Sequence, residues 1–522
     1  PVTNEYHQYN SKKAKEKGKS EAKEGGKAKE PPEPRVEVEA EEPPKPRGSR
    51  KSKKKPRGRV TAESMASNQR EISVSEFFTK NRHLLGFDNN AKALLTTVKE
   101  AVDNSLDACE EAGILPDIRV ELIEVAEERF RVVIQDNGPG IVKSQIPKIF
   151  GKLLYGSKFH RMKQSRGQQG IGISAAGMYG QLTTGKAVVI TSRTARHRPA
   201  NQFEIVLNTQ KNKPEIVEER ELEWEVDHGT RVEIELQGTY RGGRRSVDEY
   251  LEQVVIANPH AELTYVPPKG RAPMHFPRAA EELPPEPNEI KPHPYGVELG
   301  ALMKMLKESN QRWVTSALQH DFSRVSPMVA EKICDVAKVR PKASPRTLQL
   351  SDIERLFKAI PKVKIMAPRT DCVVPIGEEL IRKGLEREIE ASFYASSTRP
   401  PSVYRGNAFR VEVGLAYGGA LRARKDLDEH GEVLAVKAED KAQGPITLIR
   451  FANRVPLQYQ QGACSIFKAV IDSNWKGYGL AHPRGGLPMG PMVLIVHFAS
   501  VWVPFTSESK EAVAHYPEII KE

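Results

Sequence analysis

Hydrophobic and polar positions follow the two periods of helices and strands along most of the chain. Leu94, Val98, Val102 and Leu106 recur at four-residue spacing, which predicts the buried face of a helix over residues 90–112. A glycine and a proline directly after this stretch predict where the helix ends. Shorter apolar runs indicate strands at residues 118–125, 130–135, 187–192, 202–207 and 230–236.

The order of these elements predicts an α+β layer over about residues 72–290, which ends in a Pro-rich connector at 267–294. A helical segment follows. Ser326 before Pro327 is an N-cap with proline in the first turn, and 351–354 (Ser-Asp-Ile-Glu) fits a capping box. A small bundle is expected from helices at residues 297–308, 313–321, 328–339 and 352–359.

After Pro361 the pattern is α+β again. Strands are predicted at residues 409–416, 431–437, 446–451 and 492–498. The longest apolar run, residues 492–505, is interrupted by His497, Ser500 and Pro504 and is shorter than the ~20 residues of a membrane helix. We therefore expect a buried strand there and no membrane association.

The length of 522 residues allows about three or four domains. The net charge of +12 is concentrated at one end, because residues 1–60 carry 18 Lys and Arg against 10 Asp and Glu. This segment has almost no large apolar side chains, so residues 1–70 are predicted to be a disordered basic tail. Such a tail attracts polyphosphates, although a solubilising extension without a partner is the alternative.

The four cysteines, Cys109, Cys334, Cys372 and Cys464, have no metal-ligand spacing. Together with the lack of a signal-peptide pattern, they favour a reducing, intracellular setting. The chain ends at Glu522 without a helix stop signal, so we expect the natural protein to continue.

Three polar motifs carry candidate chemistry. Glu100 and Asn104 are four residues apart and share one face of the predicted helix. A carboxylate there can activate water, and an amide oxygen one turn later can ligate Mg²⁺. Taken alone, the same pattern also fits a solvated polar face.

The second motif follows a buried strand. Asp136 can accept a hydrogen bond from an exocyclic amine, and Gly138 and Gly140 allow a flat ring to approach the main chain. An ordinary Asx-type turn is the alternative.

The third motif is a glycine-rich loop. Gly167, Gly170 and Gly172 precede a predicted helix at 173–181, where main-chain N–H groups suit a phosphate. Their spacing is the reverse of the dinucleotide fingerprint. The nearby segment 151–158 (Gly to Lys) is not a P-loop, because Gly-Ser-Lys replaces Gly-Lys-Ser.

In order and spacing, the three motifs resemble the N, G1 and G2 boxes of GHKL ATPases. Five longer strings resemble, within that superfamily, the B-subunit family of topoisomerase VI, a type IIB topoisomerase; they are residues 99–108, 150–159, 166–175, 474–480 and 503–510. The resemblance implies a multidomain α+β fold. Its expected parts are a GHKL (Bergerat) α/β sandwich at 71–290, a helix-two-turn-helix domain at 291–366 and a transducer at 367–522 whose C-terminal helix is truncated.

The resemblance also implies residue roles. Glu100 is expected to be the general base, Asn104 the Mg²⁺ ligand and Asp136 the reader of the adenine amine. Lys476 is expected to reach the terminal phosphate of ATP. The remaining residues expected to bind ATP are Gly138, Gly140, Ser157, Lys158, Gly167, Gln168, Gln169, Gly170, Ile171, Gly172 and Thr230.

The function implied is the ATP-hydrolysing subunit of a DNA topoisomerase. ATP-driven B–B dimerisation would gate duplex passage through a break made by a separate A subunit in an A2B2 complex. A GHKL chaperone or repair clamp, and a DNA-binding scaffold with a degenerate pocket, are the rival readings. The family implies a nucleoid-associated cytoplasmic protein in a prokaryote or a nuclear one in a eukaryote. The acidic run 426–428 resembles a Mg²⁺ cluster, but its position between predicted strands favours a hairpin tip.

Overall fold

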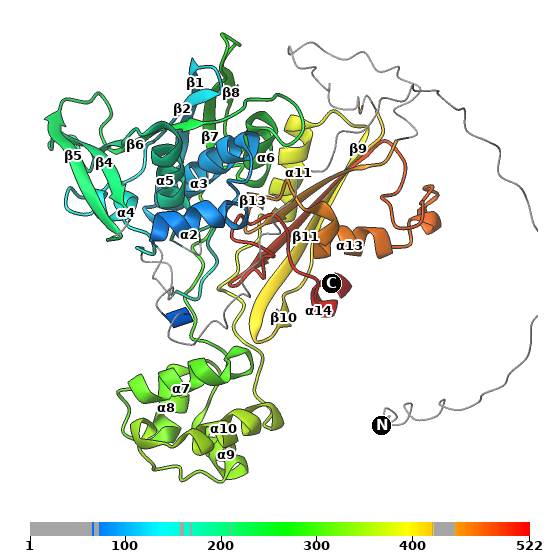
Figure 1. Ribbon diagram of the computed structural model, residues 1–522. Coiled ribbons are helices and arrows are strands. Elements are labelled where there is room, and N and C mark those ends of the chain that lie inside the picture. The colour runs from blue at the N-terminus through cyan, green and yellow to red at the C-terminus, as the bar shows by residue number, and fades with distance from the viewer. Residues whose placement is uncertain are drawn as a thin grey trace, which may run out of the picture. The chain divides into compact units, whose positions relative to one another are not determined.

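The computed structural model describes residues 65–66, 73–156, 161–167, 170–209, 211–419, 421 and 444–522 (Figure 1). The chain divides into two compact units, residues 1–70 and residues 71–522, and the second contains the helices and strands that follow. The basic tail apart from residues 65–66, the predicted strand at 431–437 and the acidic run at 426–428 lie outside the described residues.

An eight-stranded sheet forms the first part of this unit, in the order β5-β4-β3-β6-β2-β1-β7-β8. All neighbouring strands are antiparallel except β1 and β7, which run parallel. Five strands match the predicted ones, whereas β5, β7 and β8 were not predicted. The strands are β1 Asp117–Ala126, β2 Arg129–Asp136, β3 Val188–Arg193, β4 Ala200–Asn208, β5 Lys213–Leu222, β6 Gly229–Gln237, β7 Glu262–Val266 and β8 Met274–Phe276.

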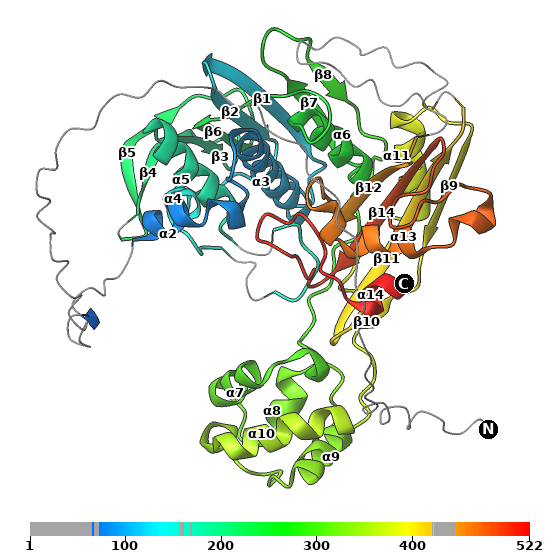
Figure 2. The same ribbon diagram turned by 45° about the vertical axis from the view of Figure 1, so that its right-hand side comes forward.

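Helices pack against this sheet (Figures 1 and 2). The predicted helix is present as α3 (Asn90–Glu111), and its four-residue apolar stripe is buried against the sheet. Helix α5 (Gly172–Thr184) lies beside α3 and contacts β6. Further helical elements are α2 Val74–Lys80, η1 Arg82–Leu85, α4 Ile146–Gly151 and α6 Val247–Ala257. The Pro-rich connector was only partly correct, because it contains β8.

The predicted helical segment forms a cluster with a hydrophobic core of its own (Figure 2). Ser326 caps α9 as predicted, since its hydroxyl accepts from the main-chain N–H of Val329. The predicted capping box is wrong by two residues: Gln349 is the N-cap of α10 and pairs reciprocally with Asp352. The elements are η2 Pro294–Gly296, α7 Leu299–Glu308, α8 Val314–Asp321, α9 Pro327–Ala337, η3 Pro345–Thr347, α10 Leu350–Ala359 and η4 Ile360–Lys362.

A second sheet follows in the order β10-β11-β14-β12-β13, with β9 also paired to β11. Its central strand β14 is buried at every position, which confirms the buried strand predicted from the longest apolar run. No described helix is long and apolar enough to cross a membrane. The elements are α11 Glu378–Glu388, β9 Phe393–Thr398, β10 Ser402–Tyr404, β11 Asn407–Tyr417, β12 Thr447–Ala452, β13 Val455–Pro456, η5 Gln461–Ala463, α13 Ser465–Asp472, η6 Trp475–Tyr478, β14 Met492–Ser500 and α14 Pro517–Lys521.

Candidate nucleotide-binding site

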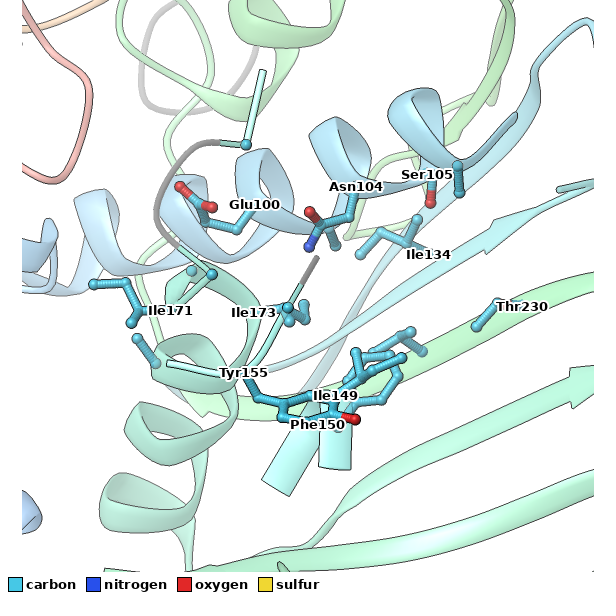
Figure 3. Close-up of a pocket in the computed structure, with 18 of the residues that line it drawn as sticks. Glu100, Asn104, Ser105, Ile134, Ile149, Phe150, Tyr155, Ile171, Ile173 and Thr230 are labelled. Carbon is cyan, nitrogen blue, oxygen red and sulfur yellow. The ribbon is translucent and has the colours of Figure 1, made fainter. Parts of the chain in front are cut away.

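A cavity of about 580 Å³ opens where α3, α4 and α5 meet strands β2 and β6 (Figure 3). Its lining includes Glu100 and Asn104 from α3, Asp136 from the end of β2 and Thr230 from β6. Apolar side chains such as Ile134, Ile149, Phe150, Tyr155 and Ile173 form much of the remaining wall (Figure 3). A cavity with an apolar wall and a few converging polar groups suits a small organic ligand that carries charge.

Helix α3 presents Glu100 and Asn104 to the same cavity, as the four-residue spacing predicts (Figure 3). The helix is well defined at its start, where the Asn89 side chain accepts from the N–H of Lys92. The apolar stripe faces the sheet, and Glu100 and Asn104 lie on another face of α3 that lines the cavity. The solvated-face alternative for this helix therefore does not hold for Glu100, which is nearly buried.

Asp136 is buried at the floor of the cavity. Its Oδ2 accepts from the Ser105 hydroxyl at 2.8 Å, and its Oδ1 accepts from the N–H groups of Gly138 at 3.0 Å and Thr230 at 3.1 Å. Burial raises the pKa of this carboxyl, and the three hydrogen bonds partly oppose that rise. A fixed carboxylate has lone pairs left over, so it can accept from an amine in the cavity.

At two positions a neighbouring group lies so close to the main chain that only glycine fits. Gly140 has φ +70°, and a Cβ there would lie 2.0 Å from the carbonyl oxygen of Arg193. A Cβ on Gly172 would lie 1.8 Å from Glu100 Oε2. The end of the glycine loop therefore rests directly on the Glu100 carboxylate, and no side chain fits between them.

The loop at 508–511 brings Lys510 into the cavity from the far end of the chain. Its Nζ lies 3.6 Å from Glu100 Oε1 and 3.6 Å from Asp103 Oδ2. Burial alone would lower the pKa of Lys510, but Glu100, Asp103 and Asp107 together raise it above its ordinary value. The ammonium group is buried and has no hydrogen-bond partner among the described residues.

Two family models match separate parts of the chain. Residues 93–239 match the family of histidine kinase-, DNA gyrase B- and HSP90-like ATPases, and residues 368–522 match the transducer of the topoisomerase VI B subunit. The B subunit of type 2 DNA topoisomerase 6 from Methanosarcina barkeri is 50% identical over 459 residues, which cover 88% of this chain and 71% of that protein. This chain belongs to the topoisomerase VI B-subunit family.

Other members of this family are similarly close. The corresponding proteins of Methanococcoides burtonii and Archaeoglobus fulgidus are 51% and 48% identical, each over 88% of this chain and over 71% and 73% of their own lengths. Among solved structures, the gyrase B subunit of Myxococcus xanthus covers 86% of this chain and 93% of its own, at 10% identity and a TM-score of 0.41. The topoisomerase VI family membership rests on the sequence relatives. As a family member with the ATPase match, the chain is an ATP-dependent topoisomerase subunit.

The structure brings most of the predicted site residues of this topoisomerase subunit together. Gly138 stands beside the cavity, where its N–H binds Asp136. Ser157, Lys158, Gln168 and Gln169 lie outside the described residues. The predicted residues that line the cavity are Glu100, Asn104, Asp136, Gly140, Gly167, Gly170, Ile171, Gly172 and Thr230.

Lys476 is the exception. It lies on the exposed 3₁₀ helix η6, and it does not line the cavity. Lys510, which was not predicted, lines the cavity instead. The string 503–510 resembles the family, yet nothing local distinguishes its final lysine from other lysines of the transducer. Lys510 is identified as a candidate site residue only by its burial against the carboxylates of Glu100 and Asp103.

The residues present fit a nucleotide with a bound divalent cation. The two carboxylates nearest the buried Lys510 ammonium lie 3.6 Å away, beyond hydrogen-bond distance, and a phosphate oxygen in the cavity is an acceptor that this ammonium can bind. The described residues contain no cluster of three or more His, Cys, Asp or Glu that would hold a metal by itself. The amide oxygen of Asn104, which lines the cavity, is the kind of hard donor that Mg²⁺ accepts together with phosphates and water.

Proposed function

We propose that this chain binds and hydrolyses ATP in the cavity and uses the cycle to control passage of one DNA duplex through another. The observation that carries the proposal is the approach of Lys510 to Glu100. The ammonium of Lys510, in the transducer, contacts α3 of the ATPase part at Glu100, the candidate base. A nucleotide bound in this cavity therefore contacts both the ATPase part and the transducer.

The cavity residues divide the work. Glu100 orients and deprotonates the attacking water, and the carboxylate of Asp136 accepts from the adenine amine. The N–H groups of Gly170 and Gly172 face the phosphates near the start of α5, and Gly167 opens the loop before them. By resemblance, the undescribed Ser157, Lys158, Gln168 and Gln169 complete this phosphate cradle.

The metal would be held by the amide oxygen of Asn104, whose side chain is exposed to the cavity. Mg²⁺, when bound, neutralises phosphate charge. The Lys510 ammonium stabilises the negative charge that develops on the transferred phosphoryl group. It then exchanges its two carboxylate neighbours for a phosphate oxygen, which makes its position dependent on the nucleotide.

The partners follow from the family. The relatives are named as B subunits of a DNA topoisomerase. We propose that an A subunit with an active-site tyrosine cuts the first duplex. Two copies of the present chain dimerise on ATP and capture the second duplex, and hydrolysis reopens the dimer.

The test is ATP-dependent relaxation of supercoiled DNA by this chain together with a cognate A subunit. Relaxation that requires ATP and is abolished by Glu100→Gln is the expected result. An assembly that relaxes DNA equally well without ATP, or with the Glu100→Gln chain, would refute the proposal. ATP hydrolysis without any relaxation would favour the clamp or chaperone alternative.

A further inference from the structure

The glycine loop is preceded by a short segment, Met162–Gly167, which we name the entry strap. It is fixed along its length by hydrogen bonds to distant parts of the chain. Ile290 donates its N–H to the Met162 carbonyl at 3.0 Å, and Lys163 pairs with Glu286 at 2.8 Å. The loop that is expected to hold phosphates therefore starts from an anchored segment.

One side of the entry strap is bound by residues of the transducer match. The Gln164 N–H donates to the carbonyl of Cys372 at 3.1 Å, and the Val374 N–H donates to Gln164 Oε1 at 2.7 Å. The side-chain amide of Asn453 donates to the carbonyl of Ser165 at 3.0 Å. Three consecutive hydrogen bonds thus join the strap to residues that lie more than 200 positions later in the chain.

The other side of the entry strap is bound by helix α3. The buried Arg166 donates through Nη1 to Asp107 at 2.8 Å and through both terminal nitrogens to Glu110, at 2.8 Å and 2.7 Å. Burial alone would raise the pKa of Glu110, but Arg166 and His260 hold it well below its ordinary value. The N–H of Gly167 also points to Asp107, at 3.3 Å. The strap is therefore tied to the helix that carries Glu100 and Asn104.

Asn453 is itself held rigidly. It lies with Arg454 in the tight turn between β12 and β13, where both residues have positive φ, 47° and 65°. Its Oδ1 accepts from the Ser500 N–H at 2.8 Å, and its Nδ2 donates to the Ser500 carbonyl at 2.9 Å as well as to Ser165. Asparagine tolerates this conformation better than most residues. The amide is thus aimed at the strap by the central strand β14.

We infer that Gln164 and Asn453 are positioning residues that couple nucleotide binding to the transducer through the entry strap, along a path separate from Lys510. This inference rests on the proposed function of the cavity. At one end of the glycine loop, the strap is hydrogen-bonded to Val374 and Asn453 of the transducer. At the other end, Gly172 packs against Glu100. A nucleotide that contacts Gly167 in the cavity wall therefore also acts on the hydrogen bonds of the strap to Val374 and Asn453.

Two substitutions test the path. Gln164→Leu removes the acceptor for Val374, whereas Gln164→Glu keeps an oxygen there and is the matched control. Asn453→Asp keeps the acceptor for the Ser500 N–H but replaces the donor to the carbonyls of Ser165 and Ser500 by an oxygen. The measurements are the dissociation constant of adenylyl-imidodiphosphate by calorimetry and hydrogen exchange of the Val374 amide with and without that nucleotide.

In the unaltered chain, nucleotide should slow exchange at Val374. Gln164→Leu and Asn453→Asp should weaken nucleotide binding roughly three- to tenfold, the loss expected for one buried hydrogen bond. Both should also abolish the nucleotide-dependent slowing, and Gln164→Glu should retain it. In Lys510→Ala the slowing at Val374 should persist, because that variant leaves the strap intact.

A merely structural role for the strap would give equal exchange changes with and without nucleotide and unchanged affinity in the two variants. That result would overturn the inference, as would loss of the Val374 response in Lys510→Ala. Absence of nucleotide binding by the unaltered, folded chain would instead refute the proposed function itself. The two failures are therefore distinguishable.

Discussion

The Lys99 ammonium donates hydrogen bonds to the main-chain carbonyls of Ser509, at 3.0 Å, and Lys510, at 3.3 Å, while the Lys510 side chain returns to Glu100, the neighbour of Lys99. Two adjacent residues of α3 thus bind the backbone and the side chain of the same transducer lysine. Burial and the nearby Lys510 charge lower the pKa of Lys99 to about 8. This crossed pair fixes the distance between the candidate base and the candidate phosphate sensor.

Removing the Lys99 amine should loosen the loop that carries Lys510. We expect Lys99→Met to lower kcat for ATP by about tenfold or more, since one or two charge-assisted hydrogen bonds are lost. The dissociation constant for adenylyl-imidodiphosphate should change less, because the floor of the cavity is untouched. Steady-state phosphate release and calorimetry measure the two effects. A variant with a normal kcat would show that the loop needs no such tether.

Glu100→Gln should separate binding from turnover. The amide preserves the shape beside Gly172 but cannot take a proton, so we expect hydrolysis to fall by roughly 10²- to 10⁴-fold. Nucleotide affinity should stay within a few-fold of the unaltered chain. A phosphate-release assay checks the first effect and calorimetry the second. Rapid hydrolysis by this variant would remove Glu100 from the role of base.

Lys510 and Lys476 give opposite expectations. Because Lys510 is buried at the cavity and Lys476 is exposed on η6, Lys510→Ala should reduce ATP turnover far more than Lys476→Ala. We expect a fall of about 10²-fold for Lys510→Ala, the size seen when one transition-state donor is removed. Phosphate release by the two variants under identical conditions decides between them. A larger loss in Lys476→Ala would restore the assignment made from the sequence.

The transducer contains a buried pair that should make stability depend on pH. Glu412 accepts from His497 Nδ1 at 2.7 Å and from the N–H groups of Ile376 and Gly377, each at 2.8 Å. The main-chain N–H of Arg454 donates to His497 Nε2, which leaves the ring hydrogen on Nδ1. Burial alone would raise the pKa of Glu412, but these donors lower it from 4.5 to about 2.

A lowered folded-state pKa means that Glu412 stabilises the fold above pH 4.5 and that this stabilisation is lost as pH falls toward 2. The shift is worth on the order of 3 kcal/mol. The thermal midpoint of the unaltered chain should therefore exceed that of Glu412→Gln at pH 6, and the difference should shrink between pH 4.5 and 3. A difference that stays constant over this range would show that the ionised form of Glu412 is not what stabilises the sheet.

Local sequence signals were reliable where one element by itself carries the information. The stripe on α3, the buried strand β14 and the Ser326 cap depend on residues a few positions apart, and all three are present in the structure. Sequence signals were weaker for strands whose formation depends on a neighbouring strand in the sheet. Strand β5, which is mostly exposed at the sheet edge, lacks an apolar run, and the short β8 lies within a proline-rich stretch.

The sequence by itself determined the family, the two α+β parts around a helical segment, and the face of α3 that carries Glu100 and Asn104. The tertiary structure alone decided which lysine contacts that face: the sequence motif favoured Lys476, but Lys476 is exposed on η6, whereas Lys510 is buried beside Glu100 and Asp103. It also decided the anchoring of the entry strap. Arg166 pairs with Glu110, and Asn453 bonds to Ser165 and Ser500, all across long stretches of the chain. These groups become partners only when folding brings them together and removes them from water.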